Sequence, residues 1–272
     1  MSENHDLYQT LRFPKTRRLM VDGGRLGRQR HIVHGLFEVD VTWARQAIRD
    51  HKERTGESLS FTAFVIACLG RAVDINKTMH AYRDWRGQLI IFEEVDVNTL
   101  FEVEVDGVKT IRPHIIRAAN KKSFRNLHDE MRAFQAKHEG SRESQFVDRF
   151  VLLPGVVRRW FLSLISKNPH WVKEYAGTIL MTGVGMFASG GFWGIPVPNH
   201  TLQITLGGIG EKPGVVGREI AIREYLSVTI SFDHDVIDGA PAARFAQRLK
   251  ELMESGYGLC EDIQERGYAI EE

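Results

Sequence analysis

The chain contains 272 residues, of which 43% are hydrophobic and 26% are charged. Its 36 Lys and Arg nearly balance its 35 Asp and Glu, so no strong basic field points to a nucleic-acid-binding protein. Length and composition predict one globular domain, although length alone would allow two. The opening segment MSENHDLYQT lacks the apolar core of a signal peptide, and we therefore expect a cytoplasmic protein.

The first predicted elements are two helices. Residues 41–52 and 61–75 carry apolar side chains at helical spacing, and Thr42 and Ser60 stand where N-caps are expected. Cys68 falls in the apolar part of the second helix, and we expect it to be a buried small residue.

Cysteines and histidines show no metal-ligand spacing, so we expect no metal. The residues concerned are Cys68, Cys260, His31, His34, His114, His170 and His200.

A hairpin and a third helix follow. Residues 95–105 and 108–116 are rich in valine and isoleucine and predict two strands that turn at residues 106–107, an Asp-Gly pair. Residues 123–134 predict a helix because their large apolar side chains recur on one face. Those side chains belong to Phe124, Leu127, Met131 and Phe134.

The segment at residues 150–165 is strongly apolar but is interrupted by Pro154, Arg158 and Arg159. It is too short and too broken for a membrane-spanning helix. We expect an amphipathic helix, and the sequence leaves its role open. It packs on its own domain or a neighbouring subunit, covers a channel mouth, docks on a partner, or lies on a membrane surface.

The most informative segment is SFDHDVIDGA at residues 231–240. The preceding residues 225–232 alternate apolar and polar side chains and predict a half-buried strand. Pro241 then opens a stretch with helical spacing that ends at Gly256. His234 therefore lies between a strand and a helix, where a rigidly held imidazole can act as a general base near neutral pH.

Asp238 lies one tight turn beyond His234, at a glycine that permits unusual backbone angles. Its carboxylate either orders the turn through backbone hydrogen bonds or pairs with a cation. The simpler alternative is that His234 and Asp238 form hydrogen bonds with each other and with the backbone, and have no catalytic role.

Three blocks of the chain carry a family resemblance. SFDHDVIDGA and the following AARF resemble the closing motif of the acyltransferase catalytic domain of 2-oxo acid dehydrogenase complexes, and chloramphenicol acetyltransferases carry a similar His-x-x-x-Asp-Gly. GTILMTGVGMF at residues 177–187 and LQITLGGIGEKP at residues 202–213 resemble two further family segments, in the family's order. Residues 95–123 are more weakly similar. The resemblance implies a catalytic domain at residues 15–272, after an N-terminal extension at residues 1–14.

The resemblance implies an α/β (α+β) fold of the chloramphenicol acetyltransferase type. In this two-layer sandwich, helices cover one face of a mixed β-sheet, and the chains form a homotrimer or a multiple of trimers. It also implies roles for three residues. His234 would deprotonate the acceptor, Thr182 would donate a hydrogen bond to the oxyanion, and Asp238 would pair with Arg17 or Arg18. His234 and Thr182 would come from different chains; taken alone, Thr182 is a threonine with strand propensity.

The chain departs from the family pattern in three places. The family arginine after the histidine is replaced by Asp235, so His234 is flanked by carboxylates whose field favours its protonated form. The family's Asn-Pro-Pro-Gln is replaced by PVPNH at residues 196–200. Residues 138–175 are longer than the equivalent loop, which marks them as an insertion.

Neither a lipoyl domain nor a peripheral-subunit-binding domain, with its Ala/Pro-rich linker, is recognisable. We therefore expect either a lipoyl group supplied in trans or a different, freely diffusing acceptor. No sequence feature identifies the residues that bind the cofactor.

The favoured hypothesis is an enzyme that moves an acyl group between coenzyme A and a thiol acceptor such as dihydrolipoamide. One alternative is an O-acyltransferase of the chloramphenicol acetyltransferase type, acting on a small metabolite or drug. The other is a non-catalytic trimeric core that binds a dehydrogenase or a lipoylated partner.

Overall fold

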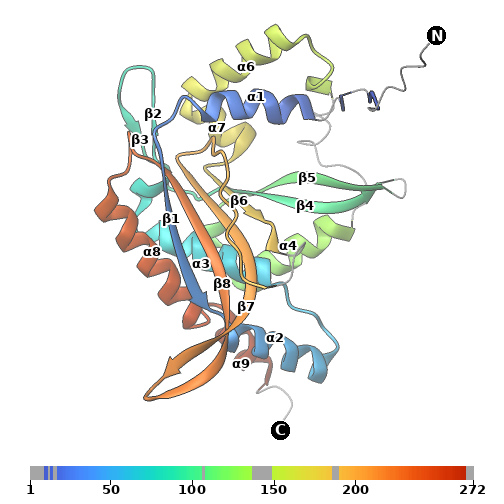
Figure 1. Ribbon diagram of the computed structural model, residues 1–272, viewed down its shortest axis with the longest axis vertical. Helices are drawn as coiled ribbons and strands as arrows, with labels where there is room; N and C mark the ends of the chain where they lie inside the picture. The colour runs from blue at the N-terminus through green and yellow to red at the C-terminus, as the bar shows by residue number, and fades with distance from the viewer. Residues whose placement is uncertain are drawn as a thin grey trace, which may run out of the picture.

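A mixed β-sheet runs through the centre of the computed structural model (Figure 1). The structure describes residues 9–11, 13–14, 17–105, 108–136, 149–185 and 190–267. The order of the six strands across the sheet is β1 (Ile32–Asp40), β8 (Glu219–Asp233), β7 (Leu202–Val216), β6 (Ile179–Gly183), β4 (Val97–Val105) and β5 (Val108–Ile116). The β6 strand is parallel to both of its neighbours, and the other pairs are antiparallel.

Helices cover one face of this sheet and enclose the main core (Figure 1). They are α2 (Thr42–Thr55), α3 (Phe61–Ile75), α4 (Phe124–Ala136), α8 (Gly239–Glu254) and α9 (Leu259–Gly267). The α3 helix is the centre of this layer, because ten of its fifteen residues are buried. The two-layer mixed architecture expected from the resemblance is therefore confirmed.

A second group of elements lies at one end of the molecule (Figure 1). It consists of α1 (Arg17–Gly27), α6 (Gly155–Lys167), α7 (Pro169–Ala176), the 3₁₀ helix η1 (Lys77–His80) and the small sheet of β2 (Tyr82–Arg83) and β3 (Leu89–Ile90). A second 3₁₀ turn, η2 (Ala119–Lys121), packs against α3. A small apolar cluster that includes Tyr82, Phe92, Ile165 and Val172 joins α6 and α7 to the hairpin.

The sheet face opposite α3 and α8 is polar. Antiparallel pairing puts Ser227, Thr229 and Ser231 of β8 on the side away from the apolar core, beside Gln203 and Thr205 of β7. These side chains are nevertheless buried, because residues 190–199 run directly over the strands.

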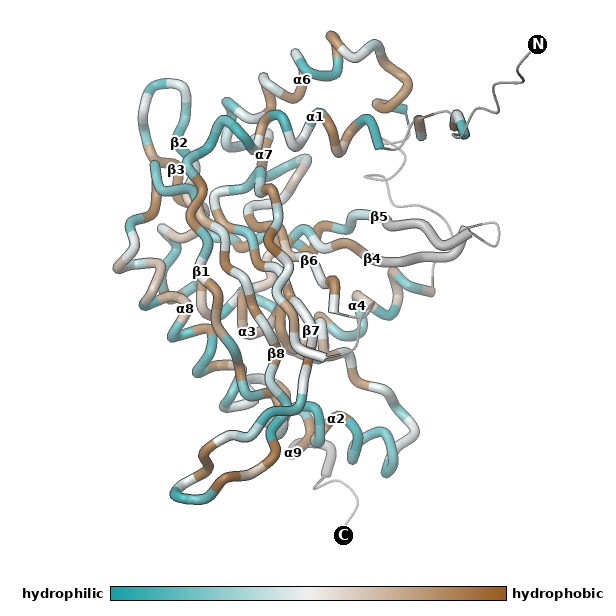
Figure 2. Tube along the Cα trace, in the orientation of Figure 1, coloured by the Kyte–Doolittle hydropathy of each residue, from teal (hydrophilic) through white to brown (hydrophobic). Residues whose placement is uncertain are grey.

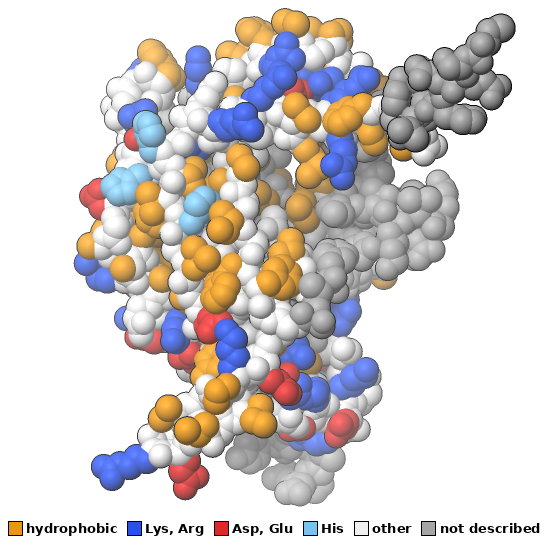
Figure 3. Space-filling view, in the orientation of Figure 1, with side chains coloured by type: hydrophobic (Ala, Val, Ile, Leu, Met, Phe, Trp, Pro, Cys, Tyr) orange, Lys and Arg blue, Asp and Glu red, His pale blue; other side chains and the backbone are white. Residues whose placement is uncertain are grey.

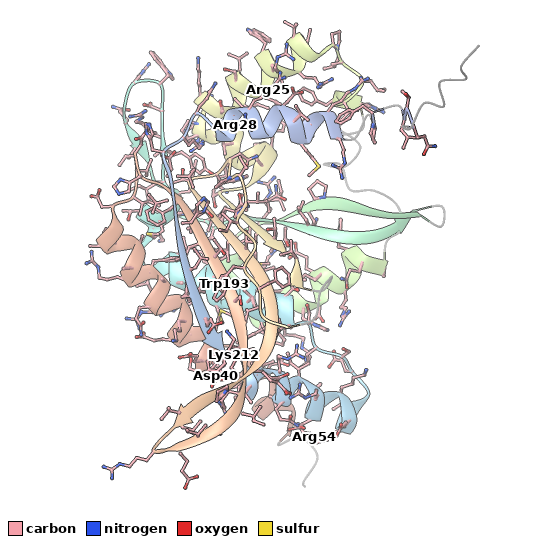
Figure 4. All side chains as sticks on the ribbon, in the orientation of Figure 1. Arg25, Arg28, Asp40, Arg54, Trp193 and Lys212 are labelled. Atoms are coloured by element: carbon pink, nitrogen blue, oxygen red, sulfur yellow. The ribbon has the colours of Figure 1, made fainter. Side chains whose placement is uncertain are left out.

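Backbone lies against backbone where residues 190–199 cross the sheet. The Gly208 N–H donates to the Phe192 carbonyl at 2.9 Å, and a Cβ on Gly207 would lie 2.0 Å from the same oxygen. The glycines of LQITLGGIGEKP are therefore required for close packing. Trp193 of this segment lies over the strands beside Lys212, whose ammonium is 5.5 Å from the centre of its ring (Figure 4).

The strands β7 and β8 continue past the sheet as a long, projecting hairpin. Figure 2 shows hydrophobic stretches along it, far from the main core. Val215, Ile220 and Ile222 are 75–80% exposed there. This hairpin is an apolar arm without a partner in the part of the chain that the structure describes.

The predicted helices and strands are present, most with small shifts at their ends; the strand predicted at residues 225–232 is part of β8 and begins six residues earlier, at Glu219. Residues 61–75 form α3 as predicted, and Ser60 caps it by accepting the Ala63 N–H at 3.2 Å. The Thr42 cap is wrong. Val41 is the N-cap of α2, because the Thr42 hydroxyl instead donates to Asp40 at 2.6 Å and accepts the Glu224 N–H at 2.8 Å. The predicted turn at residues 106–107 lies outside the described residues.

Three further expectations concern single residues or elements. Cys68 is fully buried, as predicted. The helix expected from Pro241 begins two residues earlier, at Gly239, because Asp238 already has the extended backbone of an N-cap. The amphipathic helix expected at residues 150–165 is α6, which starts at Gly155. No helix in the described ranges is both long and apolar enough to cross a membrane.

His80 is buried next to the strands and supports a first prediction. Its Nε2 lies 3.0 Å from the Phe92 carbonyl and its Nδ1 3.0 Å from the Thr178 hydroxyl. Burial lowers the pKa of His80 from 6.5 to about 4. The unfolded chain therefore binds a proton between these values that the folded chain excludes, so stability is full above pH 6.5 and is lost as the pH falls toward 4.

We expect the free energy of unfolding to fall by about 2 kcal/mol through His80 alone when the pH drops from roughly 7 to 5. Urea unfolding at both pH values measures it. In His80→Gln the pH-dependent loss should be smaller by that amount, and an unchanged loss would contradict the assignment.

Candidate functional site

The turn that carries His234 is fixed from both sides. The His234 N–H donates to the His31 carbonyl at 2.8 Å, and the Asp233 N–H donates to the Thr201 carbonyl at 2.9 Å. Within the turn, the Asp233 carbonyl accepts the N–H groups of Val236 and Ile237, both at 3.0 Å. The His234 backbone is thus held by the first strand and by the segment before β7, and its side chain is exposed.

Asp233 is the buried anchor of this turn. Its carboxylate accepts a hydrogen bond from the Arg30 guanidinium at 2.7 Å, and the side chains of Asp233 and Arg30 are only 7% and 19% exposed. The same carboxylate accepts the Asp235 N–H at 3.2 Å. Arg30 also lies 6.0 Å from the centre of the Tyr82 ring, so the ion pair is enclosed by the β2–β3 hairpin.

Asp235, which replaces the family arginine, points to other partners. It accepts a hydrogen bond from His31 Nδ1 at 2.9 Å, and Arg83 approaches its other oxygen at 4.0 Å. The hydrogen bond from His31 lowers the pKa of Asp235, and the same carboxylate raises the pKa of His31. Asp235 is therefore paired with His31 and lies near Arg83, and the His234 side chain has no hydrogen-bond partner in the described part of the chain.

A cleft of about 670 Å³ lies behind the turn. Asp233, Asp235 and Val236 line it, but His234 does not. The opposite walls come from α1, the β2–β3 hairpin and α6, with Leu26, Trp85 and Leu162 among their side chains. The insertion at residues 138–175 therefore contributes a wall of this cleft through α6; its residues 138–148 lie outside the described part.

Thr182 lies on β6, on the polar face of the sheet. It is opposite Thr205 of β7, and the two hydroxyls are 3.3 Å apart. The rest of the GTILMTGVGMF block is described up to Gly185, and residues 186–187 lie outside the described ranges.

The sheet register separates Thr182 from His234 within one chain. Thr182 pairs with Thr205, which pairs with Thr229 of β8, and His234 lies five residues beyond Thr229. At about 3.3 Å per residue this offset is roughly 16 Å along the strands, with two inter-strand spacings added sideways. The two side chains therefore cannot act on one reacting carbon within a single chain.

Asp238 and its expected partners do not form the ion pair within the chain. Asp238 is exposed at the N-cap position of α8, where its side chain makes no capping hydrogen bond. Arg17 and Arg18 are exposed at the start of α1, and neither is paired with a described residue. The buried arginine–aspartate pair of this region is Arg30 with Asp233, because Asp233 points inward from the end of β8 and Asp238 points out from a helix start.

Three further residues shape the site but were not predicted from the sequence, namely Arg30, His31 and Arg83. Arg30 and His31 directly precede a strand that pairs with β8, so a correct strand pairing would have placed them beside the His234 turn. Arg83 lies in a two-residue strand that has no periodic signal. Among the described residues, no group of three or more His, Cys, Asp or Glu side chains could hold a metal ion.

Comparison with known proteins identifies the matching family segment. Residues 170–260 match the family model described as 2-oxoacid dehydrogenases acyltransferase (catalytic domain). This range contains the blocks that carry Thr182 and His234, and it confirms the resemblance stated above.

Curated relatives extend the match along the chain. The dihydrolipoyllysine-residue acetyltransferase component of the pyruvate dehydrogenase complex from Acholeplasma laidlawii is 39% identical over 92 residues, 33% of this chain and 16% of that protein. The lipoamide acyltransferase component of the branched-chain alpha-keto acid dehydrogenase complex from Bacillus subtilis is 24% identical over 225 residues, 81% of this chain and 46% of that protein. The chain thus spans less than half the length of these relatives.

Solved structures share the fold. A probable dihydrolipoamide acetyltransferase from Listeria monocytogenes 4b F2365 superposes with a TM-score of 0.66 at 18% identity, covering 92% of this chain and 95% of that one. A chloramphenicol acetyltransferase superposes with a TM-score of 0.51 at 13% identity, covering 85% and 94%. At these identities the likeness establishes the fold.

The buried ion pair behind the turn supports a stability prediction. Replacing Arg30 by Met leaves the Asp233 carboxylate buried without its partner, and we expect a loss of about 3 kcal/mol in the free energy of unfolding. Urea unfolding at neutral pH measures this loss.

Arg49→Met is the matched control, because Arg49 pairs with Glu224 at 45% side-chain exposure. It should lose less than about 1 kcal/mol. Equal losses in the two variants would show that the Arg30–Asp233 pair does not anchor the turn.

Proposed function

We propose that this chain, whose residues 170–260 match the acyltransferase catalytic-domain model, moves acyl groups between coenzyme A and a thiol acceptor of the dihydrolipoamide type. The observation that carries the proposal is His234, an exposed imidazole without a hydrogen-bond partner in the described part of the chain, on a turn that backbone hydrogen bonds fix from both sides. Because the backbone of the turn is fixed and its imidazole has no partner within the described chain, His234 is free to accept a proton from a substrate, as a general base must.

The proposed reaction starts at the acceptor thiol. His234 removes its proton, and the resulting thiolate attacks the thioester carbonyl of acyl-coenzyme A. The tetrahedral intermediate then collapses, the new thioester remains on the acceptor, and the coenzyme A sulfur leaves and takes the proton from the imidazolium. The reverse reaction uses the same steps, so one base serves both directions.

Thr182 is the proposed donor to the oxyanion of this intermediate. Because about 16 Å of strand separates it from His234 within one chain, the site must combine His234 of one copy with Thr182 of another. We therefore propose a homotrimer, or a multiple of trimers, with a site at each junction. The exposed apolar arm formed by Val215, Ile220 and Ile222 supports association, since isolated chains rarely expose such a surface.

The pairing of Asp235 favours a catalytic chain over a non-catalytic core. Paired with His31 and near Arg83, Asp235 does not pair with His234. Its replacement of the family arginine therefore leaves the base accessible.

The acceptor is proposed from the relatives' names. They are components of dehydrogenase complexes that act on dihydrolipoyllysine or lipoamide, and we propose a lipoyl group that a separate protein supplies in trans. A dehydrogenase partner would provide the acyl-lipoyl groups. A dithiol acceptor requires a reducing compartment, and we therefore propose the cytoplasm.

Substitution of the base tests the chemistry. His234→Ala should lower turnover by about two or more orders of magnitude and leave the oligomer intact. The measurement is thiol release from a panel of acyl-coenzyme A compounds, with dihydrolipoamide, a lipoylated domain and chloramphenicol as acceptors.

His170→Ala is the control, because His170 is an exposed histidine on α7. Full activity of His234→Ala would refute the mechanism. Turnover with chloramphenicol alone would move the chain to the O-acyltransferase alternative, and no turnover with any acceptor would favour the non-catalytic core.

Mixing two inactive variants tests the shared site. Thr182→Ala should reduce turnover by about 10²–10³-fold. When Thr182→Ala and His234→Ala chains are unfolded together in equal amounts and refolded, one junction in four receives both intact groups. We expect about a quarter of wild-type turnover if each site takes one group from each chain. No recovery, with each variant still assembling normally, would place both groups in the same chain or exclude Thr182.

A further inference from the structure

The helices α1 and α6 form one rigid unit at an end of the molecule. Arg158 of α6 donates to Asp22 of α1 through Nε at 2.9 Å and Nη2 at 2.8 Å, and both side chains are buried. The same guanidinium donates to the Val151 and Leu153 carbonyls, at 3.3 and 2.8 Å. One buried group thus fixes α1, α6 and the turn before α6. We call residues 17–30 and 149–167 the α1/α6 platform.

The α1/α6 platform is strongly basic, although the chain as a whole is almost neutral. It contains nine of the 36 Lys and Arg but one of the 35 Asp and Glu, which leaves 27 basic and 34 acidic residues elsewhere. The one acidic residue is Asp22, already paired. Seven of the nine cations are exposed and form no ion pair within the described part of the chain. These seven are Arg17, Arg18, Arg25, Arg28, Arg149, Arg159 and Lys167.

Large apolar side chains are exposed between these cations. Val156 and Trp160 lie one turn apart on α6 and are 70% and 64% exposed, Leu152 in the turn before α6 is 66% exposed, and Met20 of α1 is 74% exposed. Figure 3 shows hydrophobic and basic side chains gathered together over α1 and α6. The inner side of α6 packs on the rest of the domain, where Arg158 and Ile165 are buried.

We propose that the α1/α6 platform binds the surface of an anionic lipid bilayer. A tryptophan and aliphatic side chains surrounded by arginines match the lipid interface, where apolar groups enter the headgroup boundary and cations meet anionic headgroups. The platform lies at one end of the long axis, opposite the apolar β7–β8 arm, so it can touch a flat surface while the arm contacts other copies (Figure 1).

A protein partner fits this surface less well. Protein interfaces also favour arginine, tryptophan and methionine, but charged residues are depleted at the buried centre of such an interface. Here the cations are of one sign, are spread across both helices and are mixed with the apolar groups, as in helices that lie in a membrane interface. The proposed membrane contact involves only the α1/α6 platform and does not depend on the proposed acyl transfer.

Vesicle sedimentation of the full chain tests the proposal. We expect the protein to pellet with vesicles of phosphatidylcholine mixed with phosphatidylglycerol, to stay in solution with phosphatidylcholine alone, and to be released by high salt. The double variant Arg25→Glu/Arg28→Glu should lower the partition coefficient at least about tenfold. Val156→Ser/Trp160→Ser should lower it similarly through the loss of buried apolar area.

Matched controls lie elsewhere on the surface. Arg54→Glu reverses an exposed charge at the opposite end from Arg25 and Arg28 (Figure 4), and Trp85→Ser removes a tryptophan that is 74% exposed on the β2–β3 hairpin. Both should bind anionic vesicles as the wild type does.

Three outcomes would overturn the proposal. They are equal sedimentation with both kinds of vesicle, no sedimentation with either, or wild-type binding by Arg25→Glu/Arg28→Glu. Sedimentation velocity tests for a fourth outcome that would overturn it. If Val156→Ser/Trp160→Ser breaks up an oligomer and the wild type ignores vesicles, the platform is a contact between copies. Circular dichroism shows whether each variant is folded.

Discussion

The ion pair between Arg30 and Asp233 connects the parts of the molecule on which the candidate site depends. Arg30 lies between α1 and β1, and Asp233 is the last residue of β8. The Asp233 backbone and carboxylate together accept the N–H groups that form the following turn. A carboxylate taken out of water is stable only with a partner, so the position of Arg30 determines where β8 ends and where His234 projects.

Much of the fold and the centre of the site could be predicted from the sequence, because these features depend on local periodicity. The α3 helix is apolar through most of its length, and its predicted bounds are the observed ones; the strand before His234 alternates strictly, and its end is predicted to within one residue although β8 starts six residues earlier. His234 was identified because a strand, a polar turn and a helix follow each other within a few residues. The mixed architecture followed from the family resemblance, since periodicity alone does not define strand order.

What could not be predicted depends on contacts between distant segments. Thr42 looked like a cap because its type and position fit, but β8 offers its hydroxyl a better partner in Glu224. The carboxylates that flank His234 look unpaired in the sequence, whereas Arg30 and His31 from the segment before β1 and Arg83 from β2 pair with them. The resemblance implies Arg17 or Arg18 as the partner of Asp238, whereas the arginine that strand pairing brings to the buried Asp233 is Arg30.

The sparse burial of α1 and α6 has a consequence for local stability. Each helix buries only two residues, Asp22 and Gly27 in one and Arg158 and Ile165 in the other, compared with ten in α3. Elements with so few buried contacts open at a much lower free energy than the sheet, as a separate cooperative unit. Amide hydrogen exchange would therefore be faster in α1 and α6 than in α3. Because Arg30 directly follows α1, each such opening also loosens the anchor of the His234 turn, so events at the outer helices reach the base without unfolding the core.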